Sequence, residues 1–410
     1  MTAALEFRFA SGRLSELQLA AEETPPRPLR IPLATPEQLP NASIIVPVHN
    51  GERTLQRCLT AIFASEGIGE FELIVVDDGS TDATAAIASN FPCKLIRFEH
   101  GRGPSFARNR GAEEARAARV MFVDSDVVVR PESLSLVFRA LDDSPAAFAT
   151  YDPEPLNKNF ATLLYHTLSC RSLQDTGEKT SVFYSYCAAI WKDLFFELGG
   201  FDTGFTRATF EDVELGRQLA RRGLYVKHLR DAKVFHGVRY ELPNLARAYF
   251  QKSYDLAQLL ISHGSITFGD QGWTARKNWA VLASAWGTLI FGPLALWVHP
   301  RWAVAWGLAA ASFLASTAQV YKSMARRRWF YYPLSVIGYL GIHCIATLAM
   351  AAAALHHVKK SFLSHVHVPV HRKIDQKMVE YAGPVPVGAV NVPSLQENIL
   401  KRRKQAKSAA

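Results

Sequence analysis

Short apolar runs alternate with segments of helical periodicity between residues 43 and 236 of this 410-residue chain. The runs have the length of strands and cover residues 43–48, 72–76, 94–98 and 119–123. Between the first two runs, Leu55, Leu59 and Ile62 recur at the spacing of one helix face. Strands that alternate with helices predict an α/β fold with a mainly parallel sheet. Ligands of such sheets bind beside the carboxyl ends of the strands, so the residues after each run are candidates for a site.

Three much longer apolar stretches follow, over residues 279–298, 302–321 and 330–355. A helix needs about 20 apolar residues to cross a hydrocarbon core of ~30 Å, so we predict a membrane region of two to three helices over residues 279–356. Tryptophans near the ends of the stretches are typical of the aromatic belts at a membrane interface. Pro333, Gly338 and Gly341 are compatible with a break in the third stretch.

Composition defines the rest of the domain plan. Six prolines predict that residues 1–42 form an extension and linker, and residues 43–265 form the predicted catalytic domain. Residues 357–410 form a basic tail, with ten Lys or Arg against three Asp or Glu, within a net charge of +9. Such a tail suits anionic lipid headgroups, although a merely solvated tail has the same composition. The tail has no nucleic-acid-binding module around it, so we expect no nucleic acid partner.

The positions of the basic residues predict an orientation. The cluster at residues 322–328 lies between the second and third apolar stretches, and Arg276 and Lys277 precede the first. The positive-inside rule therefore places the catalytic domain on the cytoplasmic face of the inner membrane. A third span would carry the basic tail across, against that rule, whereas a re-entrant or interfacial segment would keep it inside. Charge alone leaves both arrangements open. Five scattered cysteines and the absence of an apolar signal core in residues 1–20 also favour the cytosol.

Two aspartates, Asp124 and Asp126, follow the buried run over residues 119–123. Unpaired carboxylates at such a strand end are costly, and a divalent cation that bridges them to a diphosphate relieves the cost. Hard oxygen ligands favour Mg²⁺ or Mn²⁺. A helix cap or loop pair of aspartates is the alternative interpretation.

Acidic residues also follow the run over residues 72–76. Asp77 or Asp78 can accept hydrogen bonds from a uracil N–H group or from ribose hydroxyls, and Gly79 permits a tight turn. Ser80 and Asp82 are good N-cap residues for the helix that follows, so part of this cluster is expected to be structural.

Charged residues in two further segments are also candidates for the site at the carboxyl ends of the strands. Arg108, in a helix that opens after a glycine-rich segment, is a candidate for contact with the nucleotide or its phosphates, or a solvated arginine. Glu211 and Asp212 precede a helical pattern, and a carboxylate at a helix start can act as the base for an acceptor hydroxyl. Acidic residues at a helix start are also common for electrostatic reasons alone.

Six motifs in order make the chain similar to family-2 glycosyltransferases of the GT-A fold, which have a Rossmann-like sheet. The motifs are Ile45-Val46-Pro47-Val48-His49-Asn50, Val75-Val76-Asp77-Asp78-Gly79-Ser80-Thr81-Asp82, Ala107-Arg108-Asn109-Arg110-Gly111, Phe122-Val123-Asp124-Ser125-Asp126, Gly199-Gly200-Phe201-Asp202 and Glu211-Asp212. Together they cover roughly residues 43–236. The resemblance implies an enzyme that moves a sugar from a nucleotide-sugar donor, with UDP-sugars favoured, and that inverts the anomeric centre.

The resemblance also implies roles for individual residues. Nucleotide-sugar binding is expected from Pro47, Asn50, Glu52, Asp77 and Asp78. The metal is expected on Asp126, with Asp124 on the metal or the ribose. The catalytic base is expected to be Asp212, with Glu211 supporting it or contacting the acceptor. A later histidine completes the metal site in some GT-A enzymes, and His236 is the candidate here.

One departure from the family pattern reduces the number of functions that we expect. Processive polysaccharide synthases carry a Gln-x-x-Arg-Trp motif, and the nearest string here, Ala325–Trp329, lacks the glutamine. We therefore expect a non-processive enzyme of cell-envelope glycan synthesis. A lipid or lipid-linked glycan hydroxyl is favoured as acceptor, because the predicted site is tethered to a membrane.

Three alternatives remain. Polyprenyl-phosphate sugar synthases share the fold but use an acceptor phosphate that is already ionised. A non-catalytic nucleotide-sugar-binding membrane scaffold would bind a donor without turnover. A nucleotidyltransferase would carry a glycine-rich loop where this chain has Pro47–Glu52.

Overall fold

The computed structural model describes residues 40–204, 210–262 and 276–366. Within them, nine strands form one mixed sheet with the order β3-β2-β1-β4-β8-β6-β9-β5, and β7 pairs with β9. The strands are β1 (Ala42–Val48), β2 (Phe71–Asp77), β3 (Lys94–Arg97), β4 (Arg119–Val123), β5 (Val127–Val129), β6 (Ala146–Tyr151), β7 (Lys179–Thr180), β8 (Cys187–Trp191) and β9 (Val226–His236). The prediction of a mainly parallel α/β sheet is confirmed, with the antiparallel β8, β5 and β7 added to it.

Strand register explains why the polar clusters meet. β1, β2 and β4 are neighbours and parallel, with Val48 opposite Asp77 and Ile45 opposite Phe122. The polar residues after each strand therefore share one edge of the sheet. β5 pairs antiparallel with β9, and Val127 lies opposite His236. This pairing brings the end of β9 beside the segment that follows β4.

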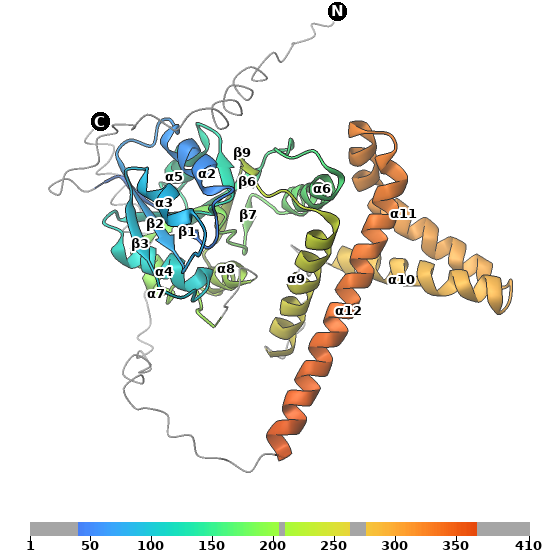
Figure 1. Ribbon diagram of the computed structural model, residues 1–410. Helices are drawn as coiled ribbons and strands as arrows, with labels where there is room; N and C mark the ends of the chain where they lie inside the picture. The colour runs from blue at the N-terminus through green and yellow to red at the C-terminus, as the bar shows by residue number, and fades with distance from the viewer. Residues whose placement is uncertain (1–39, 205–209, 263–275, 367–410) are drawn as a thin grey trace, which may run out of the picture.

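Seven helices accompany the sheet, as Figure 1 shows. They are α2 (Leu55–Phe63), α3 (Thr84–Ser89), α4 (Pro104–Glu114), α5 (Ser133–Ala140), α6 (Phe160–Gln174), α7 (Lys192–Glu197) and α8 (Glu211–Arg221). Helix α4 packs closely on β1 and β2, because a Cβ at Gly111 would lie 2.4 Å from Ile45 Cγ2. Its glycine thus sets the distance between the helix that carries Arg108 and the strands that carry the loops.

Four long helices form the second half of the chain: α9 (Leu242–Ser262), α10 (Arg276–Trp297), α11 (Trp302–Arg327) and α12 (Tyr331–Val366). Three segments are long and apolar enough to cross a membrane, Ala280–Trp297, Trp302–Arg327 and Tyr331–Val358. The third is one continuous helix, so the break suggested by its proline and glycines is not present. A second apolar core joins α6, α9, α11 and α12, whose buried members include Leu164, Tyr249, Phe313 and Ile342.

The predicted N-terminal extension and basic tail lie outside the described residues, apart from residues 40–42 and 357–366.

Candidate active site

The loops after β1 and β2 are joined by a network of hydrogen bonds. Asn50 adopts a left-handed backbone conformation with a φ of 52°, which asparagine tolerates better than most residues. Its backbone N–H donates to Ser80 Oγ at 2.8 Å, and its side-chain Oδ1 accepts from the Thr81 N–H at 3.0 Å. The Gly51 N–H donates to Thr84 Oγ1 at 2.8 Å. These bonds hold the two loops as one rigid rim.

The two aspartates after β2 are buried and already have partners in the chain. Asp77 Oδ1 accepts from the Ser80 N–H at 2.9 Å. Both carboxylate oxygens of Asp78 accept backbone N–H groups, from Arg102 at 2.8 Å and Gly103 at 2.7 Å. They therefore fix the turn and the segment that leads into α4, and their predicted contact with a nucleotide stays a prediction.

Gly79 and Pro47 also belong to the structural framework of this rim. Gly79 has a φ of +76°, and a Cβ there would lie 2.6 Å from the Gly101 backbone nitrogen. Only glycine allows this close approach between the two loops. Pro47 lies buried within β1, with its backbone opposite Val76, and the structure gives it no side-chain partner of its own among the described residues.

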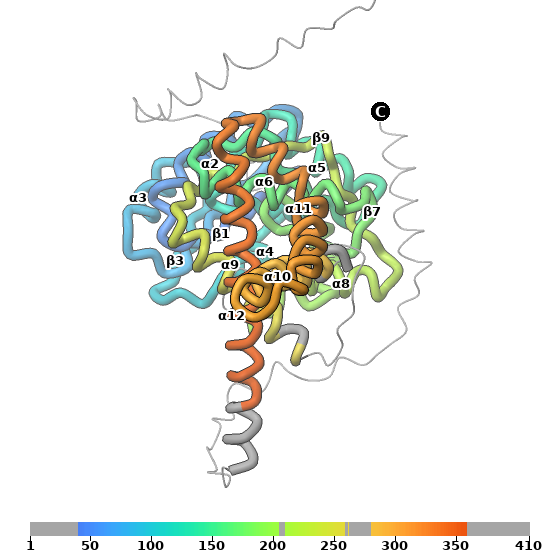
Figure 2. Tube along the Cα trace, turned by 90° about the vertical axis from the view of Figure 1, so that its right-hand side faces the viewer, coloured from blue at the N-terminus to red at the C-terminus, as the bar shows by residue number. Residues whose placement is uncertain are grey.

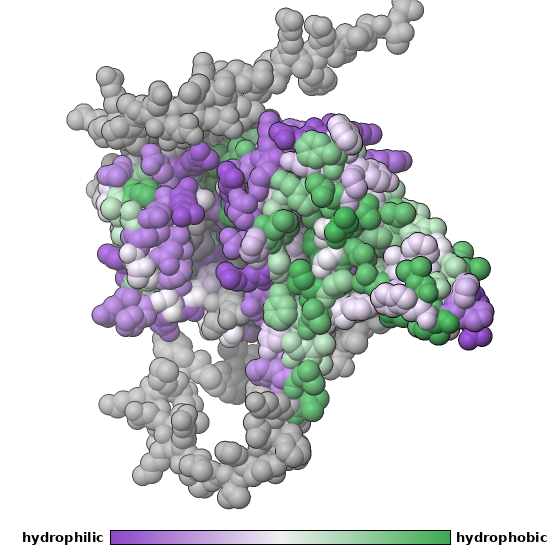
Figure 3. Space-filling model, turned by 45° about the vertical axis from the view of Figure 1, so that its right-hand side comes forward, coloured by the Kyte–Doolittle hydropathy of each residue, from purple (hydrophilic) through white to green (hydrophobic). Residues whose placement is uncertain are grey.

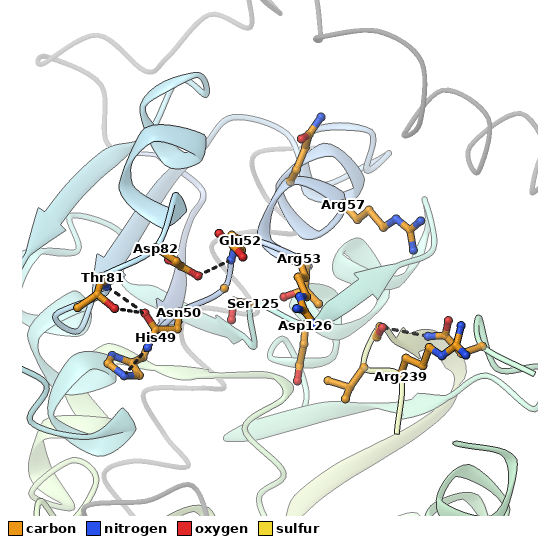
Figure 4. Close-up of a pocket in the computed structure, with 16 residues that line it drawn as sticks. His49, Asn50, Glu52, Arg53, Arg57, Thr81, Asp82, Ser125, Asp126 and Arg239 are labelled. Atoms are coloured by element: carbon orange, nitrogen blue, oxygen red, sulfur yellow. Dashed lines mark hydrogen bonds between the residues drawn. The ribbon is translucent and has the colours of Figure 1, made fainter. Parts of the chain in front are cut away.

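A pocket of about 810 Å³ opens at this edge of the sheet (Figure 4). Three of the predicted residues line it, namely Asn50, Glu52 and Asp126. The others do not.

Among the lining residues that sequence reasoning did not predict for the site, four have basic side chains, namely His49, Arg53, Arg57 and Arg239. Arg53 and Arg57 flank the start of α2, and Arg57 and Arg239 lie away from Thr81 at the other end of the pocket (Figure 4). Two signals in the sequence could have indicated these residues. Arg53 and Arg57 are spaced by about one helical turn, and Arg239 is a basic residue shortly after β9.

Arg108 is enclosed at the bottom of the site and links two carboxylates. Its Nη2 donates to Asp124 Oδ1 at 2.7 Å, and its Nη1 donates to Glu211 Oε1 at 2.8 Å. The Arg108 and Glu211 side chains are each 2% exposed. Burial disfavours the charged guanidinium, but Asp124 and Glu211 hold the pKa of Arg108 above its ordinary value. Both terminal nitrogens are thus committed to carboxylates, and Arg108 connects the end of β4 to the start of α8.

Asp126 and His236 come together through the β5–β9 pairing. His236 Nε2 lies 3.5 Å from Asp126 Oδ2. Burial opposes both charges, yet each stabilises the other, so the pKa of Asp126 is lowered and the pKa of His236 is raised. No group of three or more His, Cys, Asp or Glu side chains in the described ranges is close enough to hold a metal ion by itself. The structure therefore places two of the three predicted ligands, Asp126 and His236, in contact.

Asp212 begins α8 beside Glu211 and is held in place by three donors. Its Oδ1 accepts from the Val213 N–H at 2.7 Å, and its Oδ2 accepts from the Ser185 N–H at 3.3 Å. The Ser185 hydroxyl lies 3.5 Å from the same oxygen. Burial and the neighbouring Glu211 carboxylate raise the pKa of Asp212 to about 7. Such a pKa is matched to a general base at neutral pH.

A cation from α9 reaches the same region, which no sequence pattern indicated. Lys252 Nζ donates to Tyr165 Oη at 2.9 Å, and the Tyr165 ring stacks on His236 with centroids 5.6 Å apart. Burial would raise the pKa of the Tyr165 phenol, but the Lys252 and His236 charges lower it to about 8. Lys252 therefore extends a chain of contacts through Tyr165 and His236 to Asp126.

Comparisons with known proteins agree on the domain. Residues 43–211 match the family model described as Glycosyl transferase family 2. A succinoglycan biosynthesis protein of Rhizobium meliloti is 34% identical over 116 residues, which are 28% of this chain and 33% of that protein. A validoxylamine A glucosyltransferase of Streptomyces hygroscopicus is 27% identical over 222 residues, 45% of this chain and 53% of that protein. The chain thus spans about a third to a half of the length of these relatives.

A solved structure supports the fold. The mannosyltransferase PcManGT from Pyrobaculum calidifontis, determined with GDP-Man and Mn²⁺, superposes with a TM-score of 0.50 at 18% identity, over 83% of this chain and 94% of that one. At this identity the likeness shows the fold alone. Residues 43–211 therefore form a Glycosyl transferase family 2 domain with the GT-A fold, in agreement with the prediction from its motifs.

Proposed function

We propose that this chain is an inverting, metal-dependent and non-processive glycosyltransferase that works at the cytoplasmic face of a membrane. Its donor is a nucleoside diphosphate sugar, with UDP-sugars favoured, and its acceptor is a hydroxyl on a lipid or lipid-linked glycan. The observation that carries the proposal is the link made by Arg108. One buried guanidinium joins Asp124, beside the donor pocket, to Glu211, beside the base candidate Asp212.

The chemistry follows from this arrangement. The rim formed by Asn50 and Glu52 would hold the nucleotide in the pocket. Asp212 would take the proton of the acceptor hydroxyl while its oxygen bonds to the anomeric carbon. The bond from that carbon to the diphosphate breaks at the same time, and the electron pair leaves with the diphosphate. Attack opposite the leaving group inverts the anomeric centre.

The residues fit a divalent metal in part. Asp126 and His236 are in contact at the pocket, and Asp124 is two residues before Asp126 on the same edge. Mg²⁺ takes six ligands and is usually held by one or two carboxylates together with substrate phosphates and water. A bound Mg²⁺ or Mn²⁺ would supply charge stabilisation for the departing diphosphate. Within the chain, Asp126 would be its main ligand, and Arg108 would keep Asp124 oriented.

Turnover of labelled nucleotide sugars by the membrane-embedded chain tests the proposal. A donor panel is incubated with membrane lipid extract, with and without Mn²⁺, and new products are identified by mass spectrometry. We expect transfer that is lost in Asp126→Ala and Asp212→Asn. Full transfer by Asp212→Asn would refute the base assignment, and donor binding without any turnover would favour a scaffold.

A phosphate acceptor is the second candidate, and Lys252 favours it. A cation hydrogen-bonded to Tyr165 beside His236 suits an anionic acceptor, as a polyprenyl phosphate would be. Such a phosphate is already ionised and needs no base. Transfer that survives Asp212→Asn but fails in Lys252→Met would therefore select this function over the hydroxyl acceptor.

A further inference from the structure

Helix α12 is covered on one side by the catalytic domain along most of its length. At its start, Tyr331 contacts Phe160 of α6, with ring centroids 5.3 Å apart. Further along, the Gln258 side chain of α9 donates to the Ala353 carbonyl at 3.1 Å. The 22 residues between these contacts correspond to ~33 Å of helix. This is as long as the hydrocarbon core of a bilayer is thick, about 30 Å.

A bilayer crossed by α12 would therefore have to contain the protein beside it. Figure 1 shows α9 running alongside α12, with the sheet domain at the height of the upper part of α12. Helix α9 carries Arg247, Lys252 and Asp255, and the surface of the neighbouring domain is strongly hydrophilic (Figure 3). Charged groups within the hydrocarbon are costly, so a span by α12 conflicts with its packing.

The exposed face of α12 is apolar in a way that suits a bilayer surface. Ile337, Leu348 and Leu355 are 69%, 63% and 70% exposed. Their spacing of 11 and 7 residues places them on one face of the helix. Ala349 and Ala353, on the side toward α9, are fully buried. One side of α12 thus faces the domain, and the other presents a continuous apolar stripe.

Helices α10 and α11 point away from this layer. In Figure 2, α10 is seen end-on while α12 runs upright, so α10 leads away from the side of α12. Near its start α10 is packed, with Val281 and Ala285 buried, and the Trp286 indole N–H donates to Thr347 of α12 at 2.7 Å. Beyond that point it is open, and Leu296 and Trp297 are 80% and 82% exposed.

We propose that α12 lies flat in the membrane interface beneath the catalytic domain, and that only α10 and α11 cross the bilayer, as a hairpin. From Trp286 to Trp297 the hairpin extends ~17 Å beyond α12. An interfacial helix is itself immersed by about 5–10 Å, so Trp297 lies about 22–27 Å into a hydrocarbon core of ~30 Å, and the turn that ends at Arg301 continues toward the far headgroups. The basic tail after α12 then stays on the side of the catalytic domain, in agreement with the distribution of positive charge.

This placement has a consequence for the acceptor. Helix α9 contacts α12 through Gln258 and reaches the site through Lys252, six residues earlier. One helix therefore joins the site to the bilayer surface. An acceptor whose headgroup lies at that surface can meet the site without leaving the membrane.

Cysteine labelling in the full-length chain tests the topology. Ser408→Cys in the tail, His299→Cys at the hairpin tip and Ser89→Cys on the exposed face of the catalytic domain are each treated with a membrane-impermeant maleimide. Spheroplasts and inside-out vesicles are compared, with the unsubstituted chain as background. We expect Ser408→Cys to label from the same side as Ser89→Cys, and His299→Cys from the opposite side. Labelling of Ser408→Cys from the side of His299→Cys would overturn the proposal.

The depth of α12 in the membrane provides a second test of the topology, which does not depend on the tail. Nitroxide labels at Ile337, Leu348 and Leu355 share one helix face, so an interfacial α12 places all three at one depth. A spanning α12 would place Leu348 near the bilayer centre and Leu355 near a headgroup layer. Neither readout depends on sugar transfer, so the topology stands or falls separately from the proposed function.

Discussion

Replacing Arg108 by methionine is the sharpest test of how the site is held together. Methionine keeps much of the aliphatic volume, but it removes the only group that the structure shows bonded to both Asp124 and Glu211. Glu211 is 2% exposed, so its carboxylate would lose a buried cation. The Asp124 side chain is 29% exposed, so water can compensate part of its loss. The damage is therefore expected mainly at the start of α8.

The size of the effect follows from these exposures. Removing one partner of a buried ion pair typically costs 3–5 kcal/mol. Because Asp124 is partly hydrated, we expect the lower end, about 3 kcal/mol, for Arg108→Met. For a domain of this size each kcal/mol corresponds to roughly 2–4 °C, so the unfolding midpoint should fall by roughly 6–12 °C. Misplacement of the base should also reduce kcat by about 10²-fold.

Thermal unfolding by circular dichroism, with the chain in nanodiscs, gives the first readout. Hydrogen exchange of the segment Glu211–Arg221 gives the second, because it reports α8 separately from the membrane helices. Arg110→Met is the matched control on the same helix. Arg110 pairs with Glu113 at 2.9 Å and is 39% exposed, so its loss should change the midpoint little.

Arg108→Lys refines the test, because a lysine keeps the charge but lacks the planar fork that reaches both carboxylates. It should recover part of the stability and little of the activity. An Arg108→Met chain that melts like Arg110→Met and keeps normal exchange in α8 would refute the reasoning. The link between the two halves of the site would then have no energetic role.

Four further outcomes follow. A base with a pKa raised to about 7 is protonated and inactive below that pH. The value of kcat/KM should therefore rise about tenfold per pH unit up to about pH 7 and then level off. Any residual activity of Asp212→Asn should lack this rise. Asp78→Asn cannot accept two backbone N–H groups with both oxygens, so it should weaken donor binding, measured by calorimetry, with a smaller effect on kcat. Lys252→Met should raise the acceptor KM more than the donor KM in steady-state assays, and equal changes would contradict a role on the acceptor side. Chelation with EDTA should abolish sugar transfer, and added Mn²⁺ should restore it. The Asp126→Ala variant should need far more Mn²⁺ for the same activity. Transfer that continues in EDTA would exclude a role for the metal.

The sequence was sufficient for features that depend on local pattern. Apolar runs that end in Asp77 or Asp124 predicted buried parallel strands, and the register between them follows from the fold class. The length of the three apolar stretches predicted a region of two to three long helices, and the structure has three. These features are local because strand and helix periodicity can be read without knowing which elements pack together.

The sequence was insufficient where a side chain is used by a distant segment. The contact of Asp78 with a ligand stays a prediction, but the hydrogen bonds that its oxygens accept from the N–H groups of residues 102–103 were not indicated by any strand pattern. Arg108 lies 103 residues from Glu211, so their contact depends on the whole sheet being assembled. Lys252 lies on α9, and its contact with Tyr165 of α6 appears only once the two helices pack.

The distribution of these long-range contacts divides the site between two parts of the chain. The rim of the pocket and Asp126 come from residues 43–129, whereas Asp212, His236 and Lys252 come from later elements. Only the later part, through α6 and α9, packs against the membrane helices. The two parts pair within one sheet, through β4 with β8 and through β5 with β9, and they also meet through Arg108 and through the contact of Asp126 with His236. A shift of α9 would therefore reach the site first through Lys252, Tyr165 and His236. Under the proposed function, the loops after β1 and β2 would therefore hold the donor, and the acceptor side would be held by the helices that pack against the long apolar segments.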